Sequence, residues 1–484
     1  MQKRPLIESL EDRKLLSTFT VENLADNGLG SLRQAILDAN GNPGADVIRF
    51  ARSARDGTVT LTSGELVITD ELRIDGPGAG RLSVSGNDAS RVFRIAGGVS
   101  ASIDGLTVTH GRAFGQGGGI LNAGSLTLSD AVVSDNRVTG IAGASLGAVV
   151  DAFGGGICNT GALDVRHTRF IHNHSIGADG SASTIGSSAL GGAIMSVGTP
   201  SAPPSATITQ CSFEENEAIG GAAGTGASRA GIGGAVMNGL GTMEISQCLF
   251  DRNLAVGGLV GNAPGGFGAG SGGAIGNVAR AGDAILSVSH SILTANRAVG
   301  GDSSSSLAAQ DGRGGAIASF IFGGLTPPVT VVASASVDHC LILGNEAIGG
   351  DGATGGAGQG GGLANLNGGR LDVSDSRVVQ NRAIGGAGDA GNGGNGQGGG
   401  IFNGGPSAVG TPILTLRLSL VACNRADGGA SGGGSAGLGQ GGGLYLTPGG
   451  AASADQVTEV LGNDASTSDD DVFGTLSRTA RRRR

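Results

Sequence analysis

The sequence predicts an all-β protein: a single right-handed parallel β-helix, closed at its N-terminal end by a short α/β cap. Two observations support this fold class. Gly makes up 98 of the 484 residues without the three-residue period of collagen, and such a content would destabilise the helices of a helical bundle. Two short signatures also recur nine times, 36 to 49 residues apart, which is the pattern of a solenoid.

The two signatures define the strands of each coil. The first is Gly-Gly followed by an aliphatic residue, as in GGGILN at Ile120 and GGGICN at Ile157. The second is an Asn, usually followed two positions later by Ala, with a large apolar residue three positions earlier, such as Phe170, Phe213 or Phe250. Apolar and polar residues alternate before each Asn, as in half-buried strands. With the Gly-Gly segment, three short strands per coil are expected, and coils stacked about 4.8 Å apart place like residues above like.

The Asn residues of the second signature are predicted to form a structural ladder. An inward Asn at a coil corner can bond the Asn of the next coil and the turn backbone, which satisfies a buried amide. The predicted ladder consists of Asn136, Asn173, Asn216, Asn253, Asn296, Asn345, Asn381 and Asn424.

Small residues precede each Asn by five positions and leave room for the neighbouring Phe or Val. Cys211, Cys248 and Cys340 belong to this column and are predicted to be buried fillers. A Cys211–Cys248 disulfide between coils is an alternative, since spacing alone does not establish bridging geometry. The five Cys of the chain form no CxxC pair, so neither a disulfide framework nor a zinc pattern is expected.

Four regions follow from these patterns. The predicted helix of the cap starts at its N-cap residue Ser31, and Leu32, Ala35, Ile36 and Ala39 share one face. Segments rich in Gly, of similar length in each repeat, are expected to stack along one side, whether ordered or not. The regions are an export-like segment at 1–17, the cap at 18–54 with its helix at 31–40, the β-helix at 55–476 with irregular coils up to 113, and a disordered basic tail at 477–484.

The repeats resemble those of the polymorphic outer-membrane proteins and related bacterial surface β-helix proteins. The pairing of GG[AI]-x-N with F-x-x-N-x-A carries this resemblance over residues 55 to about 476. The segment SLEDRKLLS, from Ser9 to Ser17, is similar to the LEPR-XLL motif of large exported bacterial proteins, with Asp12 in place of the usual Pro. The resemblance implies export. The chain ends in SRTARRRR, so the resemblance does not extend to the export route of those proteins.

Composition narrows the expected partners. The net charge is −9, and Lys occurs only at Lys3 and Lys14, so no nucleic-acid partner is expected. No run of 18 apolar residues occurs, so no transmembrane segment is expected either. Cell-surface glycans or envelope proteins are the expected partners.

The same fold carries pectate lyases and polygalacturonases, so the chain was searched for convergent carboxylates. The candidates are Asp164, Glu244 and Asp372, which are expected to point outward from equivalent strands but with neutral coils between them. At about 4.8 Å per coil, Asp164 and Glu244 lie about 10 Å apart, slightly beyond an inverting pair. The run from Asp469 to Asp471 is expected to be a solvated turn. No catalytic residue is assigned.

The best candidates for metal ligands are His167, His172 and His174 in RHTRFIHNHS, where His172 and His174 are expected to share a strand face. The alternative is a polar surface, because His167 falls in a turn column with Asp, Gln and His, and no fourth ligand is in reach. Neither a metal nor a cofactor is expected.

The sequence therefore predicts an extracellular or cell-surface protein of structural or adhesive function, without enzymatic activity. The alternative is a polysaccharide lyase or glycoside hydrolase built on a β-helix.

Overall fold

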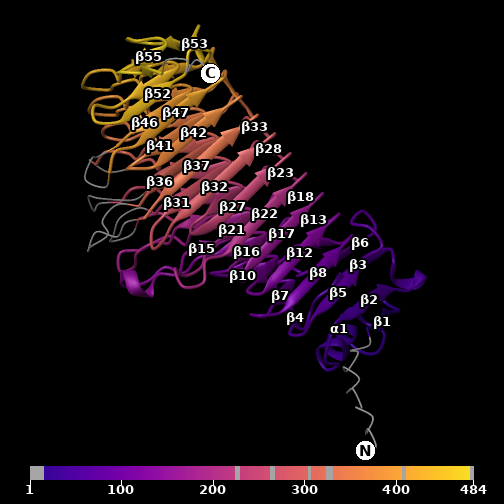
Figure 1. Cartoon of the computed structure of the whole chain (residues 1–484). Coiled ribbons are helices and arrows are strands. Elements are labelled where there is room, and N and C mark those ends of the chain that lie inside the picture. Colours follow the sequence, from indigo (N-terminus) through magenta and orange to yellow (C-terminus); the bar gives the residue numbers. More distant parts are fainter. Residues whose placement is uncertain are drawn as a thin grey trace, which may run out of the picture.

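The computed structural model confirms the right-handed parallel β-helix (Figure 1). It describes residues 16–223, 229–261, 268–303, 307–322, 331–405 and 410–479. The described strands form five parallel sheets, here named A to E. They run from β1 (Ser17–Val21) to β56 (Ser477–Arg478) in sheet A, β3 (Gly57–Thr60) to β53 (Glu459–Leu461) in B, β4 (Leu66–Ile68) to β55 (Val472–Phe473) in C, β10 (Arg112–Phe114) to β54 (Asp464–Ala465) in D, and β15 (Ala152–Phe153) to β50 (Gly439–Gln440) in E.

One coil illustrates how the repeats use these sheets. Its strands are β17 (Ala162–Arg166) in A, β18 (Arg169–Ile171) in B, β19 (His174–Ile176) in D, β20 (Ala189–Leu190) in E and β21 (Ile194–Ser196) in C. The three strands expected from the signatures are those in A, B and C. Sheets D and E are additional, and their strands of two or three residues are too short to show the alternation that marks a strand.

The first coils are more regular than the sequence indicates. Between residues 55 and 113 we expected irregular coils, because the Asn signature is missing there. Instead β5 (Leu72–Asp75) and β8 (Ser100–Asp104) pair in register in sheet A, and β6 (Leu82–Ser85) continues sheet B. The expectation of irregularity is wrong because these coils keep the inward apolar residues, such as Ile74 opposite Ile103, although they lack the Asn ladder and, before β10, the strands of sheets D and E.

Sheets A, B and C enclose one continuous apolar core. Phe170, Phe213 and Phe250 stack in it with ring centroids 4.7 and 4.6 Å apart and nearly parallel planes. All three rings are fully buried. Like residues therefore do lie above like, and each coil buries the apolar face of the next.

The N-terminal end of this core is covered by α1 (Leu32–Asn40), which contacts β1, β2 (Asp46–Phe50) and β4. Ser31 Oγ accepts a hydrogen bond from Gln34 N at 3.2 Å and caps the helix. The apolar face predicted for this helix is buried in the core. This helix has nine residues, and no helix of the described residues is long and apolar enough to cross a membrane.

The C-terminal end differs from the expectation. Ser477 and Arg478 form β56 and pair with Ser453 and Ala454 of β52 (Ala451–Ala454), so the coils extend past the predicted start of a disordered tail. Arg478 is held there because its guanidinium donates to the Asp455 and Thr458 carbonyls. Residues 480–484 of that tail, and residues 1–15 of the export-like segment, lie outside the described residues.

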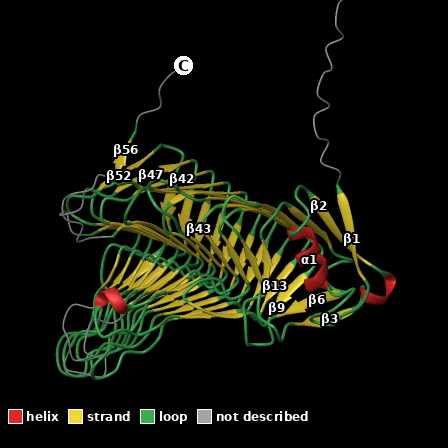
Figure 2. Cartoon of the chain, turned by 90° about the horizontal axis from the view of Figure 1, so that it is seen from below, coloured by secondary structure: helices red, strands yellow, loops and turns green. Residues whose placement is uncertain are grey.

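The Gly-rich segments, here called arms, join each strand of sheet D to the next strand of sheet E and stack on one side of the rod (Figure 2). They are ordered where they are described. Backbone hydrogen bonds of 2.8–3.0 Å run in a zigzag between the outgoing and returning halves of successive arms. A Cβ on Gly386 would lie 2.0 Å from the Gly350 carbonyl oxygen, so this close approach requires Gly. The zigzag passes through Gly268, Gly301, Gln310, Gly350, Gly356, Gly386, Gly394, Gly429 and Gly437.

Candidate functional site

The Asn residues singled out in the sequence lie at the corner between sheets B and D. Each side-chain amide Nδ2 donates to Oδ1 of the Asn one coil further on, at 2.9–3.0 Å, and the same Oδ1 accepts from a backbone N–H. A second bond from each Nδ2 goes to a backbone carbonyl, as from Asn253 to Phe213 at 2.9 Å. The column is buried and passes through Asn136, Asn173, Asn216, Asn253, Asn296, Asn345, Asn381, Asn424 and Asn463. The side chains from Asn136 to Asn424 are at most 1% exposed, so their amides bond within the protein.

A second ladder, which sequence reasoning missed, lies in sheet C. Asn122 donates to Asn159 Oδ1 at 2.8 Å, Asn238 to Asn277 at 3.0 Å and Asn365 to Asn403 at 2.7 Å. Ser196 and Ser319 take the same position in two coils. This ladder could have been predicted from the first signature, because several of its copies end in Asn, as GGGILN does.

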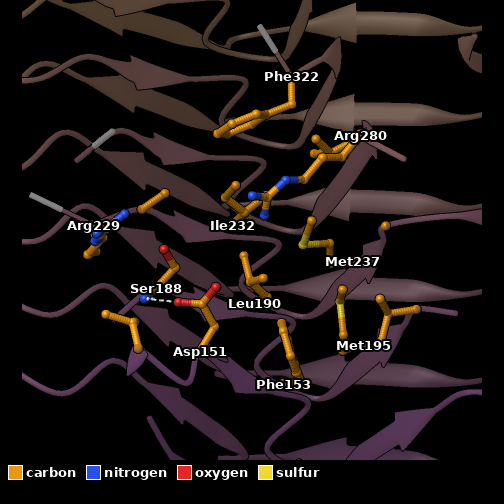
Figure 3. A pocket seen from close by; sticks show the side chains of 15 residues that line it. Asp151, Phe153, Ser188, Leu190, Met195, Arg229, Ile232, Met237, Arg280 and Phe322 are labelled. Atoms are coloured by element: carbon orange, nitrogen blue, oxygen red, sulfur yellow. Dashed lines mark hydrogen bonds between the residues drawn. The ribbon is translucent and has the colours of Figure 1, made fainter. Parts of the chain in front are cut away.

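The outer wall has a groove between sheets C and E, with a volume of about 330 Å³ (Figure 3). Its floor comes from the outward residues of successive coils. Phe153, Leu190 and Ile232 project from sheet E, while Met195 and Met237 project from sheet C. These side chains belong to an apolar cluster separate from the core of the β-helix.

Charged side chains lie at the two edges of this groove (Figure 3). Asp151 and Arg229 lie on the side of the arms, where Asp151 accepts from Ser188 N at 2.7 Å and Arg229 Nε donates to Gly186 O at 3.0 Å. Arg280 lies on the other side, after β31 (Ile275–Ala279), with its guanidinium 5.2 Å from the Phe322 ring centroid. The groove thus combines an apolar floor with two cations and one anion, as ligand sites commonly do.

No sequence pattern marks this groove. Its floor residues come from successive coils, with Phe153 and Ile232 79 positions apart, and they meet only because sheet E folds beside sheet C. Met195 looked like the residue between two inward positions of a strand. Its burial to 2% exposure comes from the arm, which the strand pattern does not describe.

The acids proposed from the sequence do not converge. Asp164 pairs in register with Thr207, and Thr207 with Glu244, so a neutral residue separates the two carboxylates. Asp372 likewise lies between Ser336 and Thr415. Asp164 is engaged by Arg166, whose Nη2 is 2.6 Å from Oδ2. This matches the spacing expected from the sequence.

A closer pair of carboxylates lies on sheet B, where the search did not look. Glu214 of β23 (Ser212–Glu214) is the register partner of Asp251 of β28 (Leu249–Asp251) in the adjacent coil. Both side chains are partly exposed, at 27% and 19%. Arg169 lies 3.4 Å from Glu214, and Arg252 lies 2.6 Å from Asp251. These cations offset the repulsion between the two acids.

The three His residues also stay apart. His167 lies 2.9 Å from Gln210, His172 lies 2.8 Å from Glu215, and His174 lies 3.1 Å from Glu217, each partner being one coil further on. His172 is in a turn with φ of 50°, and only His174 belongs to β19, so the expectation of a shared strand face is wrong. Hydrogen bonding by His174 lowers the pKa of Glu217, as expected for an ion pair.

The Cys of the small column are buried free thiols, and no disulfide joins Cys211 to Cys248. The Sγ of Cys248 accepts from Cys211 N at 3.4 Å, so it takes the place that Ser Oγ takes in other coils. Burial raises the pKa of Cys340 to about 11 and that of Cys158 to about 12. Thiols this buried and this weakly acidic are not nucleophiles.

The fold and groove define the class of protein as a right-handed parallel β-helix with a lateral groove. No family model matches the chain, and no curated protein matches it. Solved structures similar to it include a mannuronic acid specific polysaccharide family 6 lyase from human gut microbiota, with a TM-score of 0.40 at 10% identity, over 91% of this chain and 86% of that one.

Two further similar structures are α-1,3-glucanases of family GH87. The catalytic unit from Streptomyces thermodiastaticus strain HF3-3 has a TM-score of 0.33 at 12% identity, over 81% of this chain and 67% of that one. A catalytic domain in complex with nigerose has a TM-score of 0.37 at 10% identity, over 95% of this chain and 69% of that one. At such low identity, none of the three indicates what this chain binds or does.

Proposed function

We propose that this chain is an exported, non-enzymatic β-helix module of adhesive function, in which the groove between sheets C and E binds a ligand. The observation that carries the proposal is the groove itself: an apolar floor between charged edges, formed by strands rather than by loops. Strands that are hydrogen-bonded on both sides hold their side chains in place without ligand, so little ordering cost accompanies binding.

The ligand that fits these edges is an acidic cell-surface glycan. Arg229 and Arg280 provide guanidinium groups on opposite edges, and guanidinium binds carboxylate or sulfate with two parallel hydrogen bonds. The apolar floor suits the C–H faces of sugar rings, with the Phe153 and Phe322 rings at hand. Because the groove runs across coils, it suits a polymer better than a single sugar.

Binding to an array of neutral and acidic glycans tests this proposal. The Arg280→Gln variant should bind the acidic glycans about tenfold more weakly, the loss of roughly one charged hydrogen-bonding group. Arg377→Gln is the matched control, since Arg377 is exposed on the outer face of β43 (Arg377–Val379), away from the groove. Equal binding by both variants, or binding only to envelope proteins, would contradict a glycan site.

Export and the resemblance to the polymorphic outer-membrane repeats belong to the same proposal. The repeat signatures support them, with the motif between Ser9 and Ser17. Fractionation of cells that produce the full chain, followed by protease treatment of intact cells, should find the β-helix outside the cytoplasm. Recovery of the chain only in the cytoplasm would rule this location out.

A second function, a glycoside hydrolase, is favoured by one specific observation. Glu214 and Asp251 lie on neighbouring strands, which are about 4.8 Å apart, close to the 5–5.5 Å of a retaining pair. Release of reducing or unsaturated uronate ends from a panel of polysaccharides tests it. An activity that Glu214→Gln abolishes and Asp164→Asn leaves intact would establish the enzyme and overturn the non-enzymatic proposal.

A further inference from the structure

Three turns between sheets A and B bring imidazoles and carboxylates together, away from the groove. His290, His339 and Asp375 take the same turn position in three successive coils, with φ of 50°, 50° and 46°. Asp338, the last residue of β37 (Ala333–Asp338), precedes His339 directly. Because the turns are equivalent, the side chains leave the wall in parallel, one coil apart.

The geometry within this group is close. One ligand atom each of Asp338, His339 and Asp375 lies within 4.8 Å of the other two. The His290 ring stacks on the His339 ring with centroids 4.9 Å apart and an angle of 8° between planes. No other group of three His, Cys, Asp or Glu side chains in the described part of the chain meets this spacing.

The surroundings also hold the ligand atoms ready. His339 Nδ1 lies 2.7 Å from Asp338 Oδ2, and Ser374 Oγ donates to Asp338 Oδ1 at 2.5 Å. Hydrogen bonds of this kind orient ligands in metal sites.

We propose that Asp338, His339 and Asp375 form a binding site for a divalent transition-metal ion, with Zn²⁺ as the best match. Zn²⁺ binds imidazole and carboxylate together, at about 2.0–2.2 Å from each ligand atom. Two ligands of one ion are then at most about 4.4 Å apart. The three ligand atoms lie within 4.8 Å of one another, and His339 Nδ1 and Asp338 Oδ2 are 2.7 Å apart, so binding one ion requires only small rotations of these partly or fully exposed side chains.

The same column explains why the site occurs here and not at other turns. Gln210 and Gln247 take the position in two coils, and neither amide is a good zinc ligand. His167 has Gln210 on the next coil and Asp130 on the previous one, 3.8 Å away, so it lacks the second carboxylate. Among the described turns of this column, only the coils at His339 and Asp375 combine His with two acids. In the turn between sheets B and D, His172 also lies near two acids, but Asp135 is 3.7 Å from its Nδ1 and Glu215 is 2.8 Å from its Nε2, so the acids contact different ring nitrogens.

Zinc titration of the full chain, freed of metal with a chelator and followed by calorimetry, tests the site. The variants are His339→Gln and Asp375→Gln, because Gln already occupies this turn position at Gln210 and Gln247 and should be tolerated. His167→Gln is the matched control, because His167 takes the same turn position between sheets A and B in an earlier coil.

The expected result is that the wild type and His167→Gln bind one zinc ion with equal affinity. Each of the other two variants should bind it at least about tenfold more weakly. Equal far-ultraviolet circular dichroism would show that all variants are folded. A wild type that binds no zinc, or variants that bind as the wild type does, would overturn the site. Loss of binding in His172→Gln alone would overturn it as well, by moving the ion to the pair with Glu215.

Discussion

The interior of the β-helix and its Gly-rich arms stack with the same coil spacing but use opposite means. In the interior, side chains join the coils: Phe170, Phe213 and Phe250 stack, and Asn side chains bond from coil to coil. In the arms, side chains are nearly absent and backbone amides bond directly, as Gly386 N does to Gly356 O at 2.9 Å. The interior therefore gains from hydrophobic burial, whereas the arms gain only from hydrogen bonds and close contact.

This difference teaches that repetition in a sequence has two physical origins. In the interior, the same residue type recurs from coil to coil because each position must either fill the core with a side chain of a given shape or provide an amide for the Asn ladder. In the arms, Gly recurs where the backbones approach closely and a Cβ would clash, as at Gly386, although Gln310 takes one position of the zigzag. We expect mutations in the two regions to differ accordingly, both in size and in how far their effects spread.

The largest effect is expected for Phe213→Ala. Its ring is fully buried between two other Phe rings, so the truncation leaves a cavity and should lower the free energy of unfolding by about 4 kcal/mol. Urea denaturation followed by circular dichroism measures it. Phe114→Ala is the control, because Phe114 is 65% exposed and should change stability little. Equal effects would mean that the Phe column is not a core.

Asn253→Ala should cost about 3 kcal/mol. Asn253 Oδ1 accepts from Asn216 N and Nδ2, and its own Nδ2 donates to Phe213 O and Asn296 Oδ1. The truncation leaves several buried polar groups without partners, each at a cost of about 1–3 kcal/mol, partly relieved by relaxation. Hydrogen exchange should show lost protection in the coils on both sides. A loss of less than about 1 kcal/mol would show that the ladder contributes little.

Asp26→Asn tests the cap, a region that does not repeat. Burial opposes ionisation of Asp26, but hydrogen bonds from Arg33, Ser63 and Thr62 outweigh it and lower the pKa to about 2. The pKa of Asp26 is lower in the folded state than in the unfolded state. The ionised carboxylate therefore adds its full share to the free energy of unfolding above about pH 4, and this share is lost as the pH falls toward 2. We expect a loss of about 1–2 kcal/mol at pH 7 after screening by solvent.

The same variant should show almost no difference from wild type near pH 2, where Asp26 loses its charge in both states. Thermal unfolding at the two pH values measures this. Asp38→Asn, on the exposed side of α1, is the control and should be nearly neutral at both. If the difference in stability between Asp26→Asn and the wild type grew toward low pH, the lowered pKa of Asp26 would be wrong.

The smallest effect on global stability is expected for Gly386→Ala. The new Cβ would lie 2.0 Å from Gly350 O, so the arm must shift and the zigzag must break there. Because the arm lies outside the main core, the free energy of unfolding should fall by less than about 1 kcal/mol, while hydrogen exchange in the neighbouring arms rises. Gly344→Ala is a control for backbone conformation, since Gly344, unlike Gly386, has open space around it but has a φ of 63°. Slower hydrogen exchange in the arms, or loss of protection throughout sheet A, would contradict the view that the arms and the interior are stabilised separately.

Sequence patterns predicted the interior well because its physical cause is local. The alternation around Val165 or Ile208 specifies which side of a strand is buried, and the spacing to Asn specifies the corner. The helix that starts after Ser31 was equally readable from its cap and apolar face. Sheets D and E, and the first coils, were missed because their strands are short or lack the Asn signature.

The groove could not be predicted for a different reason. Whether Leu190 faces Met195 depends on where the arm returns to the wall, which is set by contacts between Gly residues many positions away. The same holds for Glu214 and Asp251, whose proximity follows from coil register and not from nearness in sequence. Even there the register was implicit in the aligned signatures, so a column-by-column inspection of sheet B would have found this pair.

The Asn ladder has a direction, and the chain treats its two ends differently. Every Nδ2 along it donates toward the C-terminus, so the amide dipoles add along the rod and leave a donor group at the far end. That last amide, on Asn463, is accepted by the Asp471 carboxylate at 2.9 Å, so Asp471 ends the ladder instead of lying in a solvated turn. The Asp471 carboxylate accepts from the donor at the positive end of the aligned amides, as an acidic N-cap residue does at the start of an α-helix. Recombinant rods lengthened by extra coils should therefore keep their final carboxylate, whatever the number of repeats before it.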